Sequence, residues 1–465
     1  MVQHLLKFRT RQQPYMVRLS YRYEMRSALT FPLASSLAEG SFTGVVAAKF
    51  FQGSPLLIAV ITAAPMFGNI MAMVWSELSR SRRKVPFVNL LQLGVIVMIA
   101  LSALTAFLPR SAGAWIFASL IIIARLLASG IITVRSVIWR ANYPGHIRGQ
   151  IVGRITVVAR AVLAMSTFLG SYWLDRNPTA FVFLYPCAAV LGGIGIWQFS
   201  GVRVRKEGQD LRRQRVNDCQ LALSEAGETT GVDFGDGDPR RGLGVFFLDA
   251  WAVLRQDDQF RRYQRYQFLS GFSFMFFGPA LLYMVSTKMT DPKREYLLAT
   301  VVLQIIPMVI SLISLQLWSP LFDRVHITTF RVFQTSTSVI GQTTLFVGAI
   351  LNQLWVVAVA QFVIGISNGG GDLAWNLGHN DFASGDKAAT YMGIHVMLTG
   401  VRGCIAPFIG AWLYQIPWIG CHVFALSALT CCVALYGFAQ MSRHAPRKIH
   451  PHRPQTQPEP VTAVR

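Results

Sequence analysis

The stretch LWVVAVAQFVIGISNGGGDLAWNL, residues 354–377, is compatible with two very different folds. Gly369, Gly371 and Ala374 fit the G-x-G-x-x-A spacing of a dinucleotide-binding turn, which follows a strand in a soluble βαβ unit. The apolar residues before them belong to a segment of helix length, and about 20 such residues cross a lipid bilayer. The rest of the chain decides between a phosphate-binding loop and a membrane helix.

The composition favours a membrane protein. Of the 465 residues, 52% are hydrophobic and only 14% are charged, whereas soluble domains carry about 25% charged residues. The six cysteines show no C-x-x-C or other metal-ligand spacing. We therefore expect no metal site and no cofactor, and we interpret the cysteines as small core residues.

Apolar runs long enough for transmembrane helices recur along the whole chain. The predicted spans are 27–50, 54–75, 86–108, 114–137, 150–174, 179–201, 266–288, 296–318, 328–351, 354–377, 391–414 and 419–441. The first run is longer than a signal-peptide core and has no small-residue cleavage site, so we keep it as a helix. The sequence thus predicts an all-α integral membrane protein with twelve transmembrane helices.

The basic residues are distributed as a membrane topology requires. If the N-terminus lies in the cytoplasm, 32 of the 43 Lys and Arg residues fall on the cytoplasmic side and 6 on the outer flanks. Cytoplasmic loops of membrane proteins are enriched in these residues. The formal net charge of +21 therefore reflects topology. We expect no nucleic-acid partner, both termini in the cytoplasm, and a location in the cell (inner, cytoplasmic) membrane.

The second half of the chain repeats a pattern of the first. At an offset of 240 residues, four glycines align with four others: Gly130, Gly145, Gly153 and Gly170 with Gly370, Gly385, Gly393 and Gly410. Internal repeats of this kind are typical of transporters. The predicted organisation is a basic cytoplasmic N-terminus (1–26), a six-helix half (27–201), a cytoplasmic linker with an amphipathic helix (202–265), a second six-helix half (266–441) and a cytoplasmic tail (442–465).

The loop WSPLFDR at 318–324, together with the two six-helix halves and the basic linker, resembles the major facilitator superfamily of secondary transporters. Asp323 and Arg324 match the acid–base pair of that family's loop between the second and third helices of a half. In the first half Arg80 takes the position of the acid, and Glu77 is the nearest substitute. The resemblance implies binding of a small-molecule substrate and alternating access by rocking of the two halves, rather than enzymatic catalysis.

Ionisable residues near the middle of spans are the candidates for a substrate and coupling site. A charge in hydrocarbon costs about 3 kcal/mol or more and is usually retained for function. The candidates are Glu39, Arg125, Arg160, Asp372, His395 and Arg402. Glu39 and Arg125 could form an ion pair with each other. Two alternatives stay open: Arg160 and Arg402 could pair with carbonyl groups or water, and His395 could be a packed polar residue.

Glu39 is the predicted proton-coupling group, followed by Asp372. A carboxyl group within a span can bind and release a proton as its access to water alternates. Three arginines against one carboxylate near mid-depth favour a solute with negative charge and an arginine as its bidentate partner. We therefore predict a monomeric, proton-coupled symporter or antiporter for a small, anionic solute in the lipid bilayer.

Two other functions remain as alternatives. A drug or metabolite efflux antiporter is one, although the glycine–proline motif that marks many antiporters is absent from the fifth span. A non-transporting membrane receptor or a polytopic membrane enzyme is the other. An enzyme would need a catalytic set, such as a Ser/His pair or two carboxylates, at the same depth in the membrane, and the predicted spans show none. A receptor would usually carry a further folded domain, and the linker is too short and polar for one.

The glycine-rich stretch is then part of the tenth helix, and its match to a dinucleotide turn is accidental. Glycine lowers helix stability by about 1 kcal/mol per residue relative to alanine, which suits a bend or a close helix contact. We predict a cytoplasmic gate with Asp372 at its centre. Its other members are Asn368, Gly369, Gly370, Gly371 and Asn376, with the loop residues Glu77, Arg80, Asp323 and Arg324.

Overall fold

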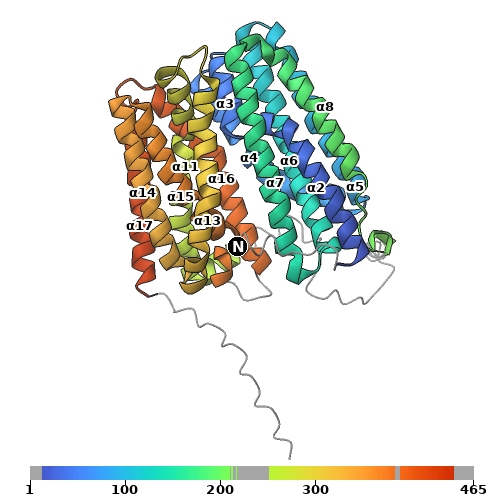
Figure 1. Ribbon diagram of the computed structural model, residues 1–465. Helices are drawn as coiled ribbons and strands as arrows, with labels where there is room; N and C mark the ends of the chain where they lie inside the picture. The colour runs from blue at the N-terminus through green and yellow to red at the C-terminus, as the bar shows by residue number, and fades with distance from the viewer. Residues whose placement is uncertain (1–12, 210, 213–215, 217–250, 383–387, 445–465) are drawn as a thin grey trace, which may run out of the picture.

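The computed structural model describes residues 13–209, 211–212, 216, 251–382 and 388–444. These residues are helical wherever they form regular structure, and the helices run side by side in two groups (Figure 1). The first group contains α2 (Tyr15–Ser35), α3 (Gly40–Lys49), α4 (Pro55–Arg80), α5 (Lys84–Ser102), α6 (Arg110–Asn142), α7 (Gly145–Arg176) and α8 (Phe181–Phe199). The second group contains α11 (Asp258–Met284), α12 (Tyr296–Thr300), α13 (Ile306–Arg324), α14 (Ile327–Leu351), α15 (Leu354–Leu377), α16 (Ala388–Gln415) and α17 (His422–Ser442).

Ten helical segments of the described residues are long and apolar enough to cross a membrane. The predicted spans 27–50 and 328–351 are not among them. The first is divided between α2 and α3, and α14 carries buried polar side chains such as Arg331 and Gln342 along its length. Helices of this length and composition indicate an integral membrane protein; the count of twelve spans stays a prediction.

Two helices begin well before the predicted spans. α2 begins at Tyr15, within the segment expected as a basic N-terminus, and α11 begins at Asp258. The Asp257 side chain accepts a hydrogen bond of 2.8 Å from the Phe260 backbone amide and so caps the first turn of α11. Residues 258–265, expected in an amphipathic helix of the linker, are instead the first turns of α11. A short helical segment at 251–256 precedes them.

The first membrane segment is broken near its middle. The 3-10 turn η2 (Ser36–Ala38) follows α2, Glu39 is extended, and Gly40 has a φ of +66°. Only glycine adopts such a φ without strain. The break brings α3 against the second group, where the Phe42 backbone amide donates a 2.8 Å hydrogen bond to Gln304 Oε1.

The glycines of α15 allow close packing, and the helix runs from Leu354 to Leu377 without interruption. A Cβ atom at Gly369 would lie 2.3 Å from Ser314 Oγ, and one at Gly370 would lie 2.9 Å from the Trp318 ring. Both neighbours belong to α13. At Gly371 nothing comes closer than 3.7 Å. Of the two structural roles expected for these glycines, the structure shows the close helix contact and no bend.

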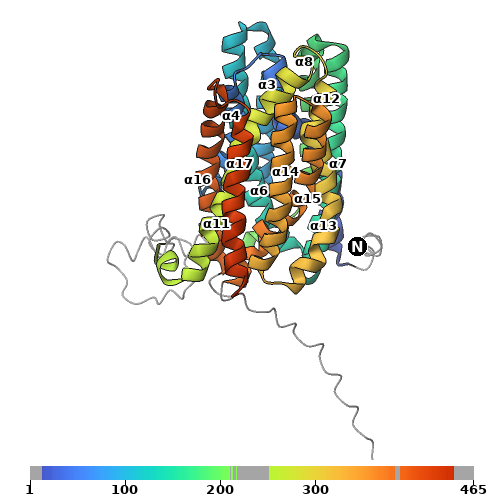
Figure 2. The ribbon, with the colours of Figure 1, turned by 90° about the vertical axis from the view of Figure 1, so that its left-hand side faces the viewer.

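The two groups contact each other mainly through α4 against α16 and α7 against α12. A Cβ atom at Gly403 of α16 would lie 2.1 Å from Met66 Cγ of α4, so the small residue permits the close approach. We call the end of the bundle where α3 ends and α12 begins the far end. The opposite end, where α2 begins and α17 ends, is the terminus end (Figure 2).

Candidate functional site

A cavity of about 760 Å³ lies between the two helix groups. α7 of the first group contributes Gln150, Thr156 and Arg160, and α15 of the second group contributes Asp372 and Trp375. Small-molecule sites in proteins usually enclose about 300–1,000 Å³. The cavity is therefore large enough for a small solute, and its walls come from both groups.

The ion pair between Arg160 and Asp372 crosses this cavity. The Arg160 Nη1 atom lies 3.7 Å from Asp372 Oδ2, and the two side chains are 41% and 52% exposed. A pair with this separation and exposure is only weakly bound. The structure thus joins two predicted site residues from different helix groups through a contact that can be exchanged for another partner.

A second cavity, of about 290 Å³, lies within the first group between α2, α6 and α7. Glu39 and Arg125 line it, and Glu39 Oε2 lies 3.3 Å from Arg125 Nη1. Because Glu39 occupies the break between η2 and α3, its carboxylate is 40% exposed. The ion pair that the sequence suggested between these residues is present in the structure.

Arg160 and Thr156 line both cavities. The two ion pairs therefore lie close together, with Arg160 in reach of whatever occupies either cavity. Arg135 lines the smaller cavity as well, so three guanidinium groups and two carboxylates line the two cavities. An anionic solute reaches an arginine of this site only by competing with a carboxylate.

Arg402 and His395 do not line either cavity. Arg402 is 4% exposed, and its Nη1 donates a 2.7 Å hydrogen bond to the Gln267 carbonyl oxygen of α11. His395 is buried, with its Nδ1 3.3 Å from Gln264 Oε1 and its ring against Trp375. The sequence left open that Arg402 could pair with a carbonyl group and that His395 could be a packed polar residue. The structure shows both of these arrangements. The charged residues that line the two cavities are therefore Arg125, Arg135 and Arg160 against Glu39 and Asp372, instead of three arginines against one carboxylate.

The predicted gate residues occupy different surroundings. Asn376 lines the large cavity, and its Nδ2 donates a 2.7 Å hydrogen bond to the Asp372 carbonyl oxygen. Asn368 is half-buried and lies one turn before Asp372 on α15. Glu77 and Arg80 form a loose pair of 4.0 Å within α4. At the end of α13 two further members are exposed, namely Asp323 and Arg324.

Polar contacts between the two groups at the far end were not foreseen from the sequence. The Asp175 carboxylate at the end of α7 accepts hydrogen bonds from the backbone amides of Tyr296 and Leu297, at 3.1 Å for the second. The Lys49 Nζ atom at the end of α3 donates a hydrogen bond to Thr290 Oγ1 at 2.8 Å. It also donates to the backbone carbonyl oxygens of Asp291 and Arg294, in the loop that precedes α12. Asp175 and Lys49 both tie the first group to the start of α12.

The loop that receives Lys49 is itself held by a carboxylate. The Lys293 backbone amide donates a 2.8 Å hydrogen bond to Asp291 Oδ1. This hydrogen bond is the main cause that lowers the pKa of Asp291, and the nearby charges of Lys49 and Arg294 act in the same direction. The loop therefore keeps a negative charge beside the Lys49 ammonium group.

A buried carboxylate near the terminus end was also missed. Glu24 of α2 is 0% exposed and contacts two side chains of α6 and the side chain of Tyr143, which directly follows α6. The partners are Arg135 at 3.1 Å, Trp139 Nε1 at 2.5 Å and Tyr143 Oη at 2.8 Å. The search for ionisable residues near the middle of spans missed Glu24, because Glu24 lies in the segment predicted to be a basic cytoplasmic N-terminus (1–26). Glu24 fastens α2 to α6 and does not line either cavity.

Comparisons with known proteins agree with this architecture. Residues 27–407 match the family model described as the Major Facilitator Superfamily. No curated protein matches the sequence. Among solved structures, the chain is similar to the nucleoside transporter NupG, with 14% identity, a TM-score of 0.61, and coverage of 91% of this chain and 98% of that chain.

Two structures of xylose transporters show the same likeness. A D-xylose-proton symporter has 13% identity and a TM-score of 0.65, with coverage of 92% of this chain and 97% of that chain. The inward-open xylose transporter XylE from E. coli has 13% identity and a TM-score of 0.60, with coverage of 93% and 97%. At such low identity these likenesses concern the fold. Because the family model matches most of the sequence, the chain belongs to the major facilitator superfamily of membrane transport proteins.

Proposed function

We propose that the protein carries a small solute across the membrane by alternating access, together with protons. Membership of a transporter family supports the transport step. The observation that carries the proposal is the Arg160–Asp372 ion pair, which connects the two helix groups inside the large cavity. Rocking of the groups changes this distance, so a ligand that binds at the pair biases the conformational equilibrium.

Protonation connects the carboxylates to the solute. An ionised Asp372 holds Arg160 at 3.7 Å. Once Asp372 is protonated, the guanidinium group is free to form a bidentate contact with an acidic group of the solute. Glu39 and Arg125 offer the same exchange in the smaller cavity, and Glu39 is the proposed coupling site. We therefore propose a solute with one acidic group that is carried in symport with a proton.

The proposed topology retains twelve spans in two halves, with the terminus end in the cytoplasm as the basic loops favour. In this orientation the contacts of Asp175 and Lys49 close the route to the outside. The cavity would then face the cytoplasm. We keep the monomer expected from the sequence as the proposed transport unit.

Uptake into proteoliposomes tests the proposal. The substrates are a panel of small radiolabelled carboxylic acids, neutral sugars and nucleosides, each with and without an acidic exterior. We expect an acid to accumulate with the gradient and to exchange without it. Glu39→Gln should abolish accumulation but retain exchange, because binding survives while coupling is lost. Arg160→Gln should raise the KM for the acid about 10-fold or more, which corresponds to one lost charge-assisted contact.

Matched controls separate these roles from general damage. Asp258→Asn removes a carboxylate at the start of α11, and Arg443→Gln removes an exposed arginine after α17; both lie at the terminus end, outside the two cavities and the predicted gate. Neither should change uptake. Gradient-driven accumulation that persists in both Glu39→Gln and Asp372→Asn would contradict proton coupling through these residues. Uptake restricted to neutral solutes would contradict the acidic substrate, and gradient-driven export would favour the antiporter alternative.

A further inference from the structure

A third pocket lies outside the two cavities of the transport site. It has a volume of about 690 Å³ and lies where the short segment 251–256 meets α11 and α16. Its lining combines apolar and basic side chains, including Trp251, Phe268, Leu398, Arg255, Arg261 and Arg265. None of these residues lines the cavities that hold the two ion pairs.

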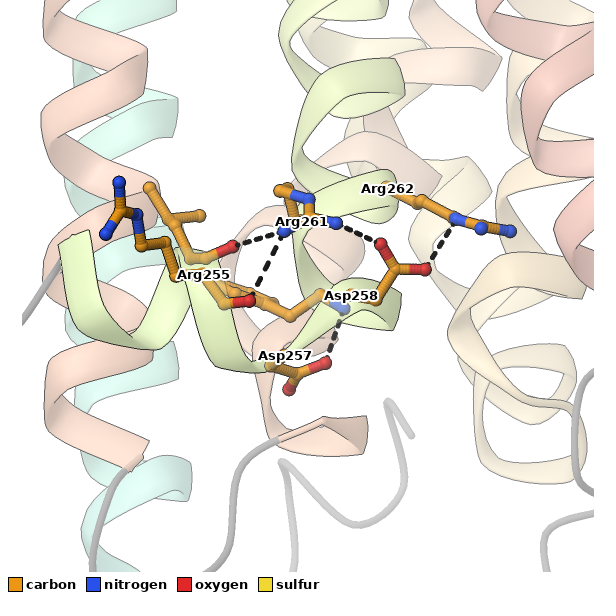
Figure 3. A network of polar contacts seen from close by, with 7 residues as sticks. Arg255, Asp257, Asp258, Arg261 and Arg262 are labelled. Carbon is orange, nitrogen blue, oxygen red and sulfur yellow. Dashed lines mark hydrogen bonds and ion pairs between the residues drawn. The ribbon is translucent and has the colours of Figure 1, made fainter.

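Acidic residues near the pocket are already engaged, as Figure 3 shows for the start of α11. Asp258 binds Arg261 through one oxygen and Arg262 through the other, the second contact at 2.7 Å. Arg261 Nη1 also donates to the carbonyl oxygens of Leu254 and Arg255 at 3.2 and 3.3 Å. The buried Nε atom of Arg261 has no hydrogen-bond partner among the described residues.

Two arginines of the pocket remain uncompensated. The Arg255 guanidinium lies 5.4 Å from the centre of the Trp251 ring, and both Arg255 and Arg265 are exposed. Neither forms an ion pair within the described part of the chain. The other nearby acid, Asp257, accepts a hydrogen bond from Tyr391 Oη at 2.8 Å. The pocket therefore joins an excess of positive charge to an apolar lining.

The position of the pocket matches the surface of a bilayer. α11 is one of the helices that can cross a membrane, so its first turns lie where it enters the lipid. The neighbouring Trp251 is 59% exposed, and tryptophan and arginine are the residues that favour this interfacial depth. Arginine binds phosphate oxygens in bidentate fashion. The apolar lining is suited to contact with an acyl chain, whereas it forms no favourable contact with a free inorganic anion.

We propose that this pocket binds the headgroup and upper acyl chain of an anionic phospholipid. Arg255, Arg261 and Arg265 contact the phosphate region, and Phe268 and Leu398 contact the chain. The lipid links the segment 251–256 to α11 and α16. Binding at this pocket is independent of the solute and of the proton sites proposed above.

Native mass spectrometry of the full-length protein in detergent micelles tests the site. The protein is titrated with dioleoylphosphatidylglycerol and, in parallel, with dioleoylphosphatidylcholine and with inorganic phosphate. We expect selective retention of phosphatidylglycerol. Each basic residue near an anionic surface contributes about 1 kcal/mol, or about 5-fold in affinity. Arg255→Gln and Arg265→Gln should each weaken retention by about that factor, and the double variant by roughly 30-fold.

The matched control is Arg262→Gln. Arg262 lies on the same helix and binds the same Asp258 but does not line the pocket, so its loss should leave retention unchanged. Equal retention of phosphatidylcholine, or an equal loss in the control, would overturn the proposal. Binding of inorganic phosphate with the same dependence on Arg255 and Arg265 would assign the pocket to a free anion and overturn it as well. Melting temperatures show whether each variant is folded. If the double variant is unstable, the test relies on the single Arg265→Gln variant.

Discussion

Removal of the Asp175 carboxylate should open the far end of the bundle. This group accepts the backbone amides of Tyr296 and Leu297, which lie at a helix N-terminus and favour a negative partner. A hydrogen bond to a charged group contributes about 1.5–3 kcal/mol. Because Asp175 is only half-buried, we take the lower value for each bond, or about 3 kcal/mol in total. Asp175→Ala should therefore shift the closed-to-open equilibrium at the far end about 100-fold.

Electron–electron double resonance measures this shift directly. Spin labels at Ser111 and Gln353 report the separation of the two groups, because both positions are exposed at the far end, one in each group. The labels are attached to cysteines in a variant that lacks the native cysteines. We expect a longer-distance population in Asp175→Ala and a smaller one in Asp175→Asn, which keeps an acceptor but loses the charge.

Asp258→Asn serves as the control because it removes a carboxylate at the terminus end that lies outside the predicted gate and pairs only within its own helix. It should leave the far-end distances unchanged. The outcome that refutes the reasoning is an unaltered distance distribution in Asp175→Ala in a protein that remains folded and monodisperse. In that case the contacts of Lys49 and the packing of α3 hold the far end closed without Asp175.

Three further predictions concern stability in detergent, measured as melting temperatures. Glu24→Gln should destabilise the fold by roughly 3 kcal/mol, because it removes the buried charge that holds the half-buried Arg135, whereas Glu77→Gln should have no effect. Gly410→Ala should lower the melting temperature strongly, because a Cβ atom there would lie 1.8 Å from the Phe276 carbonyl oxygen. Burial lowers the pKa of His379, so the unfolded chain binds the proton more tightly; stability should fall as the pH drops below about 6.5, and less so in His379→Gln.

Each of these has a clear contrary result. A Glu24→Gln protein as stable as the Glu77→Gln control would show that the α2–α6 contact contributes little. An unchanged melting temperature in Gly410→Ala would show that α11 and α16 separate easily at Phe276. Identical pH profiles for the wild type and His379→Gln would exclude a contribution of His379 to the acid sensitivity.

The helical membrane architecture and the family resemblance were accessible from the sequence. Apolar runs of about 20 residues predict spans because hydrophobic length is a local property. The WSPLFDR loop at 318–324 is equally local, and the family match over residues 27–407 agrees with the resemblance it carries. Helix ends were less accessible: α2 and α11 continue into polar residues, because partners such as the side chains around Glu24 satisfy them only in the folded protein.

Charged residues with similar sequence surroundings have different roles in three dimensions. Arg160 and Arg402 both lie within apolar spans, yet Arg160 faces a cavity and Arg402 binds a backbone carbonyl of α11. Which direction a side chain faces depends on the rotation of its helix about its own axis and on its neighbours. The effect of a glycine on its helix also depends on the packing, because a glycine permits either a bend or a close contact. The glycines of α15 leave the helix continuous, whereas the first segment is broken at Glu39, next to Gly40.

The sequence by itself therefore determined that this protein is a helical membrane transporter, because hydrophobic length, charge distribution and a loop motif are properties of short segments. The sequence also suggested that Glu39 could pair with Arg125, as the structure shows, but only the tertiary structure decided that Arg160 meets Asp372. The tertiary structure also decided that the Asp175 carboxylate binds the backbone amides of Tyr296 and Leu297 at the far end. These pairs join residues that are distant in the chain, and their formation depends on how the helices pack.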